Sequence, residues 1–180
     1  MQIDRHPDYV TFSLEDEAGE YYWGNVIRDN WDSISIVATV TINTVSGAYA
    51  SAGVIYYEIG RHHGNKISAR IAIVAASRNY KGRVEGQINE RQSDGNNKRL
   101  ATLRFPDFDT SAVGRAVTIG LGRLGNAVYF YQAGVDAYLT YQPHYDLGDV
   151  GNSSGSSIYT NVSAKAVVQS IISNVWILNG

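Results

Sequence analysis

The chain has no cysteine among its 180 residues. A disulfide framework and a thiolate metal site are therefore both excluded, and the sequence is compatible with reducing and oxidising compartments alike. Cross-links are not needed at this length, because a domain of this size buries about 70% of the surface that its unfolded chain exposes.

The chain also lacks an excess of charge of one sign and any long apolar run. Fifteen Lys and Arg stand against 17 Asp and Glu, with the two signs interspersed. Nucleic-acid binding through phosphate neutralisation needs a basic stripe, so we expect no nucleic-acid partner. No apolar run approaches the roughly 20 residues that span a bilayer, and residues 1–7 lack the apolar segment of a signal peptide. We therefore expect no membrane span.

Tyrosine and glycine are abundant, with 13 Tyr and 18 Gly against one Met and three Pro. Aromatic residues suit a pleated sheet, and glycine suits its turns. Over most of the chain apolar residues alternate with polar ones, which is typical of half-buried strands. The pattern predicts strands at 34–42, 53–59, 67–73, 83–90, 100–105, 117–121, 127–132, 138–142, 162–168 and 172–178.

No segment keeps a helical period for more than about two turns. Regularly spaced strands without helices predict an all-β, antiparallel, two-sheet sandwich or barrel. We expect one domain over residues 1–180, with residues 1–30 forming an outer strand or two that lead into it. Residues 60–65 are predicted to close a hairpin, and residues 146–157, rich in Gly, Ser, Asn and Asp, to form a surface loop.

Three segments carry a resemblance to a known superfamily. They are Ser51–Tyr57, which begins with small residues and Gly, Ala116–Gly134, which has Gly125 and Asn126 at a turn, and Ile172–Ile177. In this order they resemble the concanavalin A-like lectin/glucanase superfamily, which implies a jelly-roll β-sandwich. The superfamily holds lectins, carbohydrate-binding modules, glycoside hydrolases, polysaccharide lyases and viral attachment domains, so the fold leaves the activity open.

The phase of each strand predicts which polar side chains share a sheet face. The apolar phase is expected in the core: Ile55, Tyr57, Ile59, Ile67, Ala69, Ile71, Val84 and Ile88. The opposite phase is predicted to line a saccharide groove: Tyr56, Glu58, Arg70, Arg83, Glu85, Gln87 and Asn89. Aromatic rings with paired donors and acceptors suit a sugar. The alternative is a solvated face with cross-strand ion pairs, such as Glu58 with Arg70.

Metal-ligating residues are sparse. His62 and His63 are adjacent, so their side chains point opposite ways in an extended segment, and we interpret them as solvated loop residues. Four aspartates have the oxygen ligands of a structural calcium site, although turn-forming Asp explains them as well: Asp107, Asp109, Asp146 and Asp149. We expect no cofactor and no bound calcium.

The three tryptophans, Trp23, Trp31 and Trp176, are expected in the core or at sheet edges. Trp176 lies in an apolar terminal run. Trp23 follows two tyrosines, and the alternative interpretation of its ring is an exposed platform on which a ligand stacks.

An enzyme of the retaining-glucanase kind is not indicated. That chemistry places two carboxylates about 5 Å apart, and Glu58 and Glu85 are the only strand carboxylates expected on the groove face. Two segments are similar to jelly-roll alginate lyases, which pair a Gln-Ile-His strand with a later Tyr-Phe-Lys-Ala-Gly-x-Tyr strand: Gln87–Asn89 and Phe130–Asp136.

This resemblance places Asn89 at the family's base, Gln132 at its Lys and Asp136 at its catalytic Tyr. It therefore implies that the proton-transfer groups are missing. A chance match of two short segments is the alternative.

The resulting hypothesis is a non-catalytic, lectin-like, carbohydrate-binding sandwich that recognises a glycan on its concave sheet face. A polysaccharide lyase or glycoside hydrolase of the same fold is one alternative, and a viral or cell-surface attachment domain is the other. The expected partner is a glycan or polysaccharide, and an oligomer is compatible with the sequence. An extracellular, periplasmic or virion-surface location is favoured.

Overall fold

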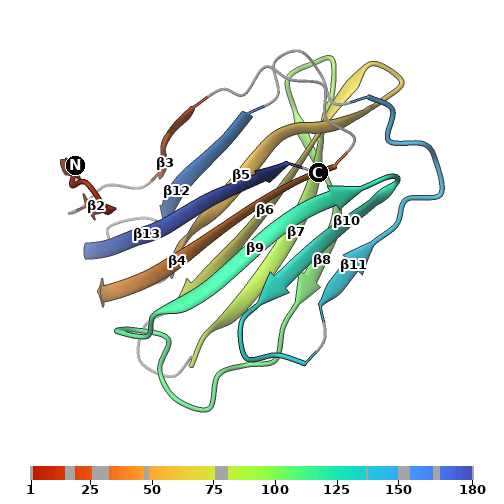
Figure 1. Cartoon of the computed structure of the whole chain (residues 1–180). Helices are drawn as coiled ribbons and strands as arrows, with labels where there is room; N and C mark the ends of the chain where they lie inside the picture. Colours follow the sequence, from red (N-terminus) through yellow and green to blue (C-terminus); the bar gives the residue numbers. More distant parts are fainter. Residues whose placement is uncertain are drawn as a thin grey trace.

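The computed structural model describes residues 2–14, 19–25, 33–46, 49–75, 81–136, 138–149, 155–163 and 167–179. Within these ranges β-strands are the only regular secondary structure. The strands form two antiparallel sheets stacked face to face (Figure 1). The predicted all-β, two-sheet fold is confirmed. No helix in the described part of the chain has the length and hydropathy needed to cross a lipid bilayer.

Sheet A has seven strands. In spatial order they are β1 (Gln2–Arg5), β2 (Tyr9–Leu14), β13 (Val167–Asn179), β4 (Ser33–Ser46), β9 (Val117–Leu124), β10 (Ala127–Gln132) and β11 (Leu139–Tyr141). The strand that comes last in this sequence thus lies between β2 and β4, near the middle of the sheet.

Sheet B has six strands. In spatial order they are β3 (Gly19–Asn25), β12 (Gly155–Ser163), β5 (Tyr49–His62), β6 (Asn65–Ala75), β7 (Arg83–Arg91) and β8 (Asn97–Arg104). Strands β5 to β8 follow one another both along the chain and across the sheet, so their side chains form continuous rows.

The core fills the space between the two sheets. Phe12, Ile36 and Phe130 from sheet A and Tyr56 and Ile71 from sheet B belong to one buried cluster. The expected phase is confirmed for β6 and β7, where Ile67, Ala69, Ile71, Val84 and Ile88 are all buried. In these strands apolar residues alternate mainly with polar ones, so only one phase keeps the polar side chains out of the core.

Tight turns close two of the predicted hairpins. Strands β5 and β6 pair up to His62 and Asn65, leaving His63 and Gly64 in the turn. Both have positive φ, 49° and 81°, as a two-residue type I′ turn requires. Strands β9 and β10 turn at Gly125 and Asn126, as the resemblance implied.

Two strand predictions near the end of the chain are wrong in their bounds. Strand β12 begins at Gly155, so the predicted surface loop over residues 146–157 includes the first residues of a strand. The run 162–168 is not one strand, because β12 ends at Ser163 and β13 begins at Val167.

Trp176 is not in the core, because 64% of its side-chain surface is exposed. The pairing of β13 with β4 shifts between Ser173 and Trp176, where Asn174 has a φ of 50°. One extra residue in a strand turns the following side chains to the opposite face, so Trp176 points out of the sheet. The Trp31 prediction lies outside the described residues, and so does the side chain of Trp23.

Candidate functional site

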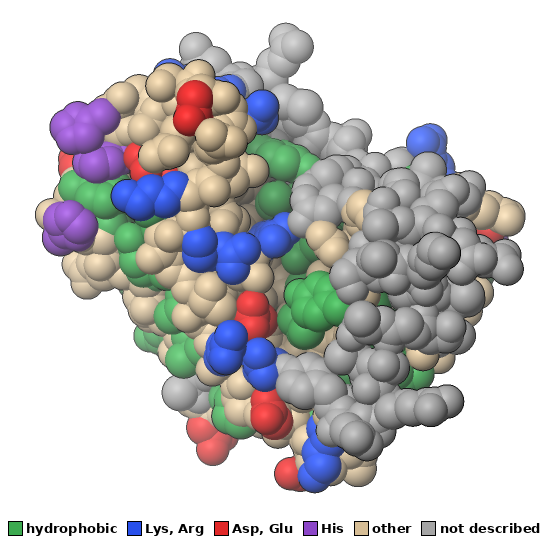
Figure 2. Space-filling model, turned by 180° about the vertical axis from the view of Figure 1, so that it is seen from behind, with side chains coloured by type: hydrophobic (Ala, Val, Ile, Leu, Met, Phe, Trp, Pro, Cys, Tyr) green, Lys and Arg blue, Asp and Glu red, His purple; other side chains and the backbone are tan. Residues whose placement is uncertain are grey.

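A groove of about 580 Å³ crosses the outer face of sheet B. Its lining side chains, called the sheet B groove below, are Ile55, Tyr57, Glu58, Lys66, Ser68, Arg70, Asn89, Arg91, Asn97 and Arg99. They come from β5, β6, β7 and β8. Figure 2 shows the reverse side of the molecule, with Lys and Arg side chains set along its hollowed surface.

The strand register explains why these residues meet. Ile55, Arg70 and Gln87 are opposite one another on three neighbouring strands, and Ser68 pairs with Asn89 in the next row. Residues two apart on a strand share a face, so these rows alternate with rows that enter the core. Six of the seven predicted groove residues lie on this outer face: Glu58, Arg70, Arg83, Glu85, Gln87 and Asn89.

The prediction for Tyr56 is wrong. Tyr56 is fully buried in the core cluster, and Ile55 and Tyr57 take the outward positions. Residues 53–59 are apolar in both phases apart from Glu58, so hydrophobic alternation could not choose between them. Ile55 forms a second small apolar cluster with Ala72 and Tyr159.

Glu58 lies at an irregularity in β5, where the register of its pairing with β6 shifts. The pairing of β5 with β6 shifts between Tyr56 and Gly60, and Glu58 has a φ of 54°. This left-handed conformation is uncommon for a residue with a side chain and costs of order 1–3 kcal/mol. After the shift Ile59 returns to the core, as expected.

The carboxylate of Glu58 is buried and fully paired. Arg61 donates from Nε to Oε1 at 2.6 Å and also contacts Oε1 through Nη2, while Lys66 Nζ lies 3.0 Å from Oε2. Both cations are about half exposed. Glu58 therefore holds the end of the β5–β6 hairpin together and does not present an unpaired negative charge to the groove.

Next to the groove, a chain of hydrogen bonds fixes the polar side chains of β6 and β7. Arg70 Nε donates to Gln87 Oε1 at 2.7 Å, and Gln87 Nε2 donates to Glu85 Oε1 at 2.9 Å. Glu85 Oε2 lies 3.3 Å from Arg83 Nη2 and 3.4 Å from Arg104 Nε. The bonds hold Arg70 in place, and its guanidinium also lies 5.7 Å from the centre of the Tyr159 ring.

The groove carries an excess of positive charge. Among the described residues that line it are Lys66, Arg70, Arg91 and Arg99, and Glu58 is the one carboxylate in that described set. Arg99 Nε donates to Asn89 Oδ1 at 2.7 Å, which orients both side chains at the edge of the groove. Because cations outnumber anions, the potential of this surface favours an anionic ligand.

The two strand carboxylates are both held in ion pairs. Glu58 is bound by Arg61 and Lys66, and Glu85 by Arg83 and Arg104. Each of the two carboxylates is therefore engaged with two cations.

The segments compared with alginate lyases do not share a sheet. Gln87–Asn89 lies in β7 of sheet B, whereas Phe130 and Gln132 lie in β10 of sheet A. Gln132 is buried. The two segments therefore lie in different sheets, and the residue-by-residue match to alginate lyases stays a prediction.

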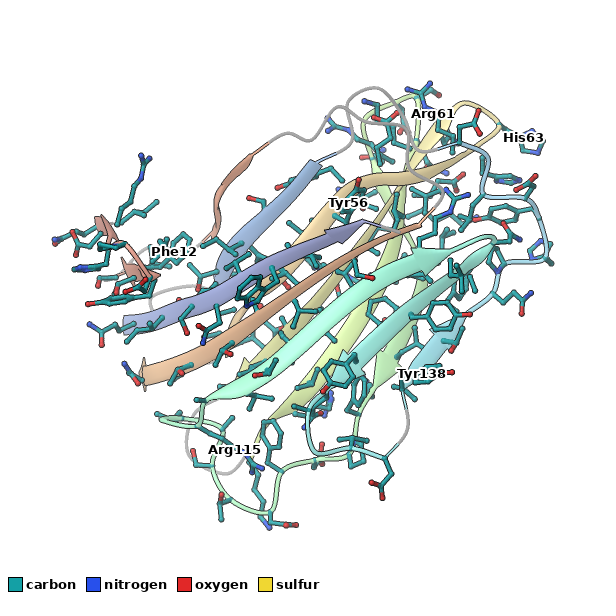
Figure 3. The ribbon with its side chains drawn as sticks, in the orientation of Figure 1. Phe12, Tyr56, Arg61, His63, Arg115 and Tyr138 are labelled. Atoms are coloured by element: carbon teal, nitrogen blue, oxygen red, sulfur yellow. The ribbon has the colours of Figure 1, made fainter. Side chains whose placement is uncertain are left out.

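The histidines and aspartates lie at the ends of the sandwich. Arg61 and His63 are at one end of the molecule and Arg115 at the other (Figure 3). His63 is exposed, but His62 stacks on Tyr145 with ring centres 3.6 Å apart, and its Nδ1 lies 3.6 Å from Glu90 Oε1.

The aspartates make local contacts. Asp107 lies 3.4 Å from Arg83 Nη1, and Asp146 accepts a hydrogen bond from the amide of Gly148. Within the described ranges no three His, Asp or Glu side chains are grouped as a metal site would require.

The 145–148 segment is bound tightly to both sheets. The guanidinium of Arg123, in β9, donates to the carbonyl oxygens of Ile59 at 2.6 Å, Gly148 at 2.6 Å and Gly125 at 2.7 Å. Gly60 permits this approach, because a β-carbon there would lie 2.6 Å from the carbonyl oxygen of Leu147. The segment thus fixes the end of β5 from which Glu58 enters the groove.

Sequence reasoning missed several groove residues. Asn97 and Arg99 belong to β8, which begins three residues before the predicted run 100–105. The pairing of β7 with β8 shifts between Ile88 and Asn89. Residues 97–99 are all polar, so the hydrophobic alternation that predicts β8 begins only after them.

Comparison with known proteins supports the fold. No family model matches the sequence, and no curated protein matches it either. Solved structures do match: a functionally unknown protein from Saccharomyces cerevisiae has a TM-score of 0.62 at 7% identity, over 99% of this chain and 92% of that one. The fold is a concanavalin A-like jelly roll.

Two further solved structures match the chain over most of its length. An alginate lyase from Pseudomonas aeruginosa has a TM-score of 0.60 at 14% identity, over 99% of this chain and 86% of that one. The CBM2 module of the evolved Dit protein of Lactobacillus casei BL23 phage J-1 has a TM-score of 0.50 at 12% identity, over 94% and 67%. At these identities the likeness shows a shared jelly-roll architecture alone.

Proposed function

We propose that this protein binds an acidic polysaccharide along the sheet B groove. The observation that supports the proposal is the charge of the described lining: four cations stand against one carboxylate, so a net positive charge remains after Lys66 has paired with Glu58. Carboxylate groups along a polyuronate chain match guanidinium groups, which bind them in a bidentate, geometrically specific manner.

The remaining groove residues suit a sugar chain. Tyr57 exposes 36% of its surface and lines the groove beside Ile55. An aromatic ring stacks on the apolar face of a pyranose, and Asn89 and Asn97 supply paired donors and acceptors for hydroxyl groups. The alginate lyases among the structural neighbours act on a polymer of this class. An extracellular, periplasmic or virion-surface location fits such a ligand.

Eliminative cleavage is the second candidate function. In that reaction a base removes the C5 proton of a uronate, the C4–C5 double bond forms, and the bond from C4 to the glycosidic oxygen breaks as that oxygen is protonated. A cation or amide that binds the uronate carboxylate assists the proton's removal. The groove places a phenol, Tyr57, on the same face as Arg70 and Asn89, which is the observation that favours this reading.

The first experiment measures affinity for alginate and polygalacturonate against neutral dextran by isothermal calorimetry. We expect binding of the acidic polymers alone, weakened about tenfold or more by added salt, because screening weakens exposed charge pairs. Arg99→Ala should weaken binding by about tenfold to a hundredfold. Lys81→Ala, which removes an exposed charge away from the groove, is the matched control. Equal affinity for dextran, or an unaltered affinity in Arg99→Ala, would refute the proposal.

The second experiment follows ultraviolet absorbance of the unsaturated uronate during incubation with the same polymers. Cleavage that Tyr57→Phe abolishes while binding persists would support the lyase function. Binding without any absorbance change in the unaltered protein would exclude cleavage of these polymers and leave the binding function standing.

A further inference from the structure

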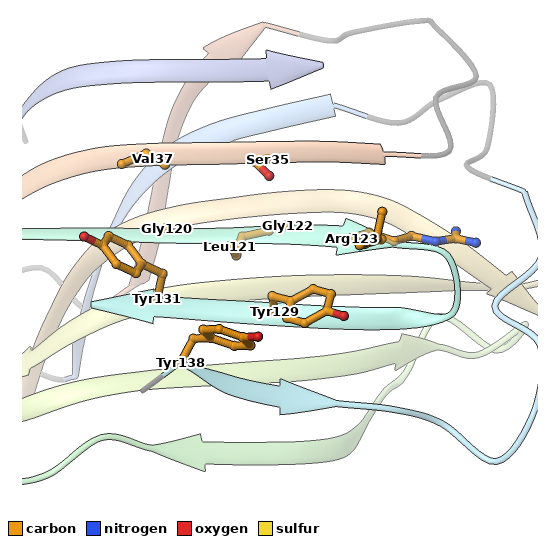
Figure 4. Close-up of a pocket in the computed structure, with 10 residues that line it drawn as sticks. Ser35, Val37, Gly120, Leu121, Gly122, Arg123, Tyr129, Tyr131 and Tyr138 are labelled. Atoms are coloured by element: carbon orange, nitrogen blue, oxygen red, sulfur yellow. The ribbon is translucent and has the colours of Figure 1, made fainter. Parts of the chain in front are cut away.

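A second cavity lies on the opposite side of the sandwich, on the outer face of sheet A. It is a shallow trough of about 450 Å³, called the sheet A trough below. The floor is formed by Gly120 and Gly122 of β9. Tyr129 and Tyr131 of β10 and Tyr138 stand along one side, and Ser35 and Val37 of β4 along the other (Figure 4).

The register of sheet A builds this trough. Val37, Gly120 and Tyr131 are opposite one another on β4, β9 and β10, and Ser35, Gly122 and Tyr129 form the neighbouring row. Each row therefore has a glycine of β9 in its middle, so the floor of the trough carries no side chain at these two positions. The tyrosine rings of β10 stand along one side of it. The rings of Tyr129 and Tyr138 meet edge to face with centres 5.5 Å apart, which fixes the aromatic wall.

The apolar surface continues beyond the trough. Trp176 pairs with Val37 in the register of β13 and β4, so its exposed indole extends the same row. Tyr131 is 44% exposed and Tyr138 is 62% exposed. Exposed aromatic residues gathered on one face mark a binding surface more often than scattered ones do.

The described lining residues offer no charge to a ligand. Among them Arg123 is the one charged residue, and its guanidinium is directed away to the backbone carbonyls of Ile59, Gly125 and Gly148. Arg123 is only 9% exposed. The trough thus differs from the sheet B groove, and an anionic ligand would lose its hydration there without gaining a partner.

We propose that the sheet A trough is a second binding site, which takes a neutral saccharide chain. The glycine floor admits a flat pyranose ring, and the rings of Tyr131 and Tyr138 supply stacking surfaces for its apolar face. The hydroxyl groups of the tyrosines and of Ser35 supply hydrogen bonds without charge. This site is independent of the acidic-polysaccharide groove, from which it is separated by the thickness of the sandwich.

The test titrates the full chain with neutral oligosaccharides, namely cellohexaose, xylohexaose, mannohexaose and maltohexaose, by calorimetry and by shifts of backbone amide resonances. We expect at least one to bind and to shift amides of β9 and β10. Tyr131→Ala and Tyr138→Ala should each weaken that binding by about tenfold or more. Tyr9→Ala, an exposed tyrosine elsewhere on sheet A, is the control and should bind as the unaltered protein does.

A filling variant complements these truncations. Ser35→Phe should occupy the trough and abolish neutral-oligosaccharide binding while alginate binding persists, and Arg99→Ala should do the reverse. Failure of every oligosaccharide to shift these amides overturns the proposal. If sedimentation then shows concentration-dependent association that Tyr131→Ala abolishes, the occupant is a second copy of the chain instead.

Discussion

The ring of Phe130 fills the space in which a β-carbon on Gly86 would stand, only 2.6 Å from that position. Gly86 belongs to β7 of sheet B and Phe130 to β10 of sheet A, so the contact spans the core between the two sheets. The two neighbours of Gly86, Glu85 and Gln87, belong to the hydrogen-bonded row beside the sheet B groove. The packing of the core and the placement of the groove residues therefore depend on the same backbone.

Gly86→Ala should destabilise the protein by about 1–3 kcal/mol, because the new methyl group overpacks a filled core. Chemical denaturation monitored by circular dichroism measures the loss. The double variant Gly86→Ala, Phe130→Leu should recover part of it, since the smaller side chain makes room. If the loss of stability in the double variant equals the sum of the two single losses, the Phe130 ring is not what the new methyl group collides with.

Glu58→Gln should lower stability without weakening the binding of acidic polysaccharide. The change removes a buried carboxylate that two cations bind, but Arg61 and Lys66 are half exposed and can be solvated. We therefore expect a loss of about 1–2 kcal/mol, not the larger cost of stranding a buried charge. Alginate affinity should hold or rise, because the groove becomes more positive. If the variant is fully folded under the assay conditions and its affinity for alginate still falls markedly, Glu58 contacts the ligand directly.

Arg123→Leu should destabilise the protein by about 1–3 kcal/mol. The substitution retains an apolar stem but leaves the carbonyl of Ile59 without its buried donor and releases Gly148. Hydrogen exchange should quicken most at the amide of Arg61, which donates to the carbonyl of Leu147 in the same segment. Unchanged exchange at Arg61 would show that the 145–148 segment is held without Arg123.

The raised pKa of Tyr145 should lower the free energy of unfolding at alkaline pH. Burial raises the pKa of its phenol to about 12, with a smaller contribution from Tyr141. The unfolded chain releases this proton near the ordinary value of 10, before the folded protein does, so the free energy of unfolding falls as the pH rises from 10 to 12. Tyr145→Phe should flatten this part of the stability profile measured by urea denaturation. An equally steep profile in the variant would assign the loss to other groups.

The sequence predicted the fold and most of the outer face of sheet B. The alternation in β6 and β7 fixed which side chains face outward, whereas the alternation in β5 did not. The phase of β6 and β7 was predictable, because Ile67 and Ile71 alternate with Ser68 and Arg70, and only one phase buries the apolar set. Tyr56 was not, because β5 passes between two apolar surfaces, the core and the cluster around Ile55.

Irregular backbone accounts for the other differences. The shift after Tyr56 moves Glu58 into the groove, and the shift before Trp176 moves that ring out of the sheet. An extra residue in one strand leaves no hydrophobic signature, since it changes pairing and not composition. Asn97 and Arg99 were missed because they precede the apolar residues Leu100 and Leu103, which pack against the core and make the rest of β8 recognisable.

The position of β13 between β2 and β4 bears on how the protein is made. Strands β2 and β4 do not pair with one another, so sheet A stays divided until residues 167–179 have been synthesised and inserted. Until then β2 and β4 each present an open edge with unpaired backbone groups, the kind of edge that recruits other chains. Pairing over such sequence separation is also slow. Expression at lower temperature, where synthesis slows and hydrophobic association weakens, should therefore favour the folded protein over aggregates.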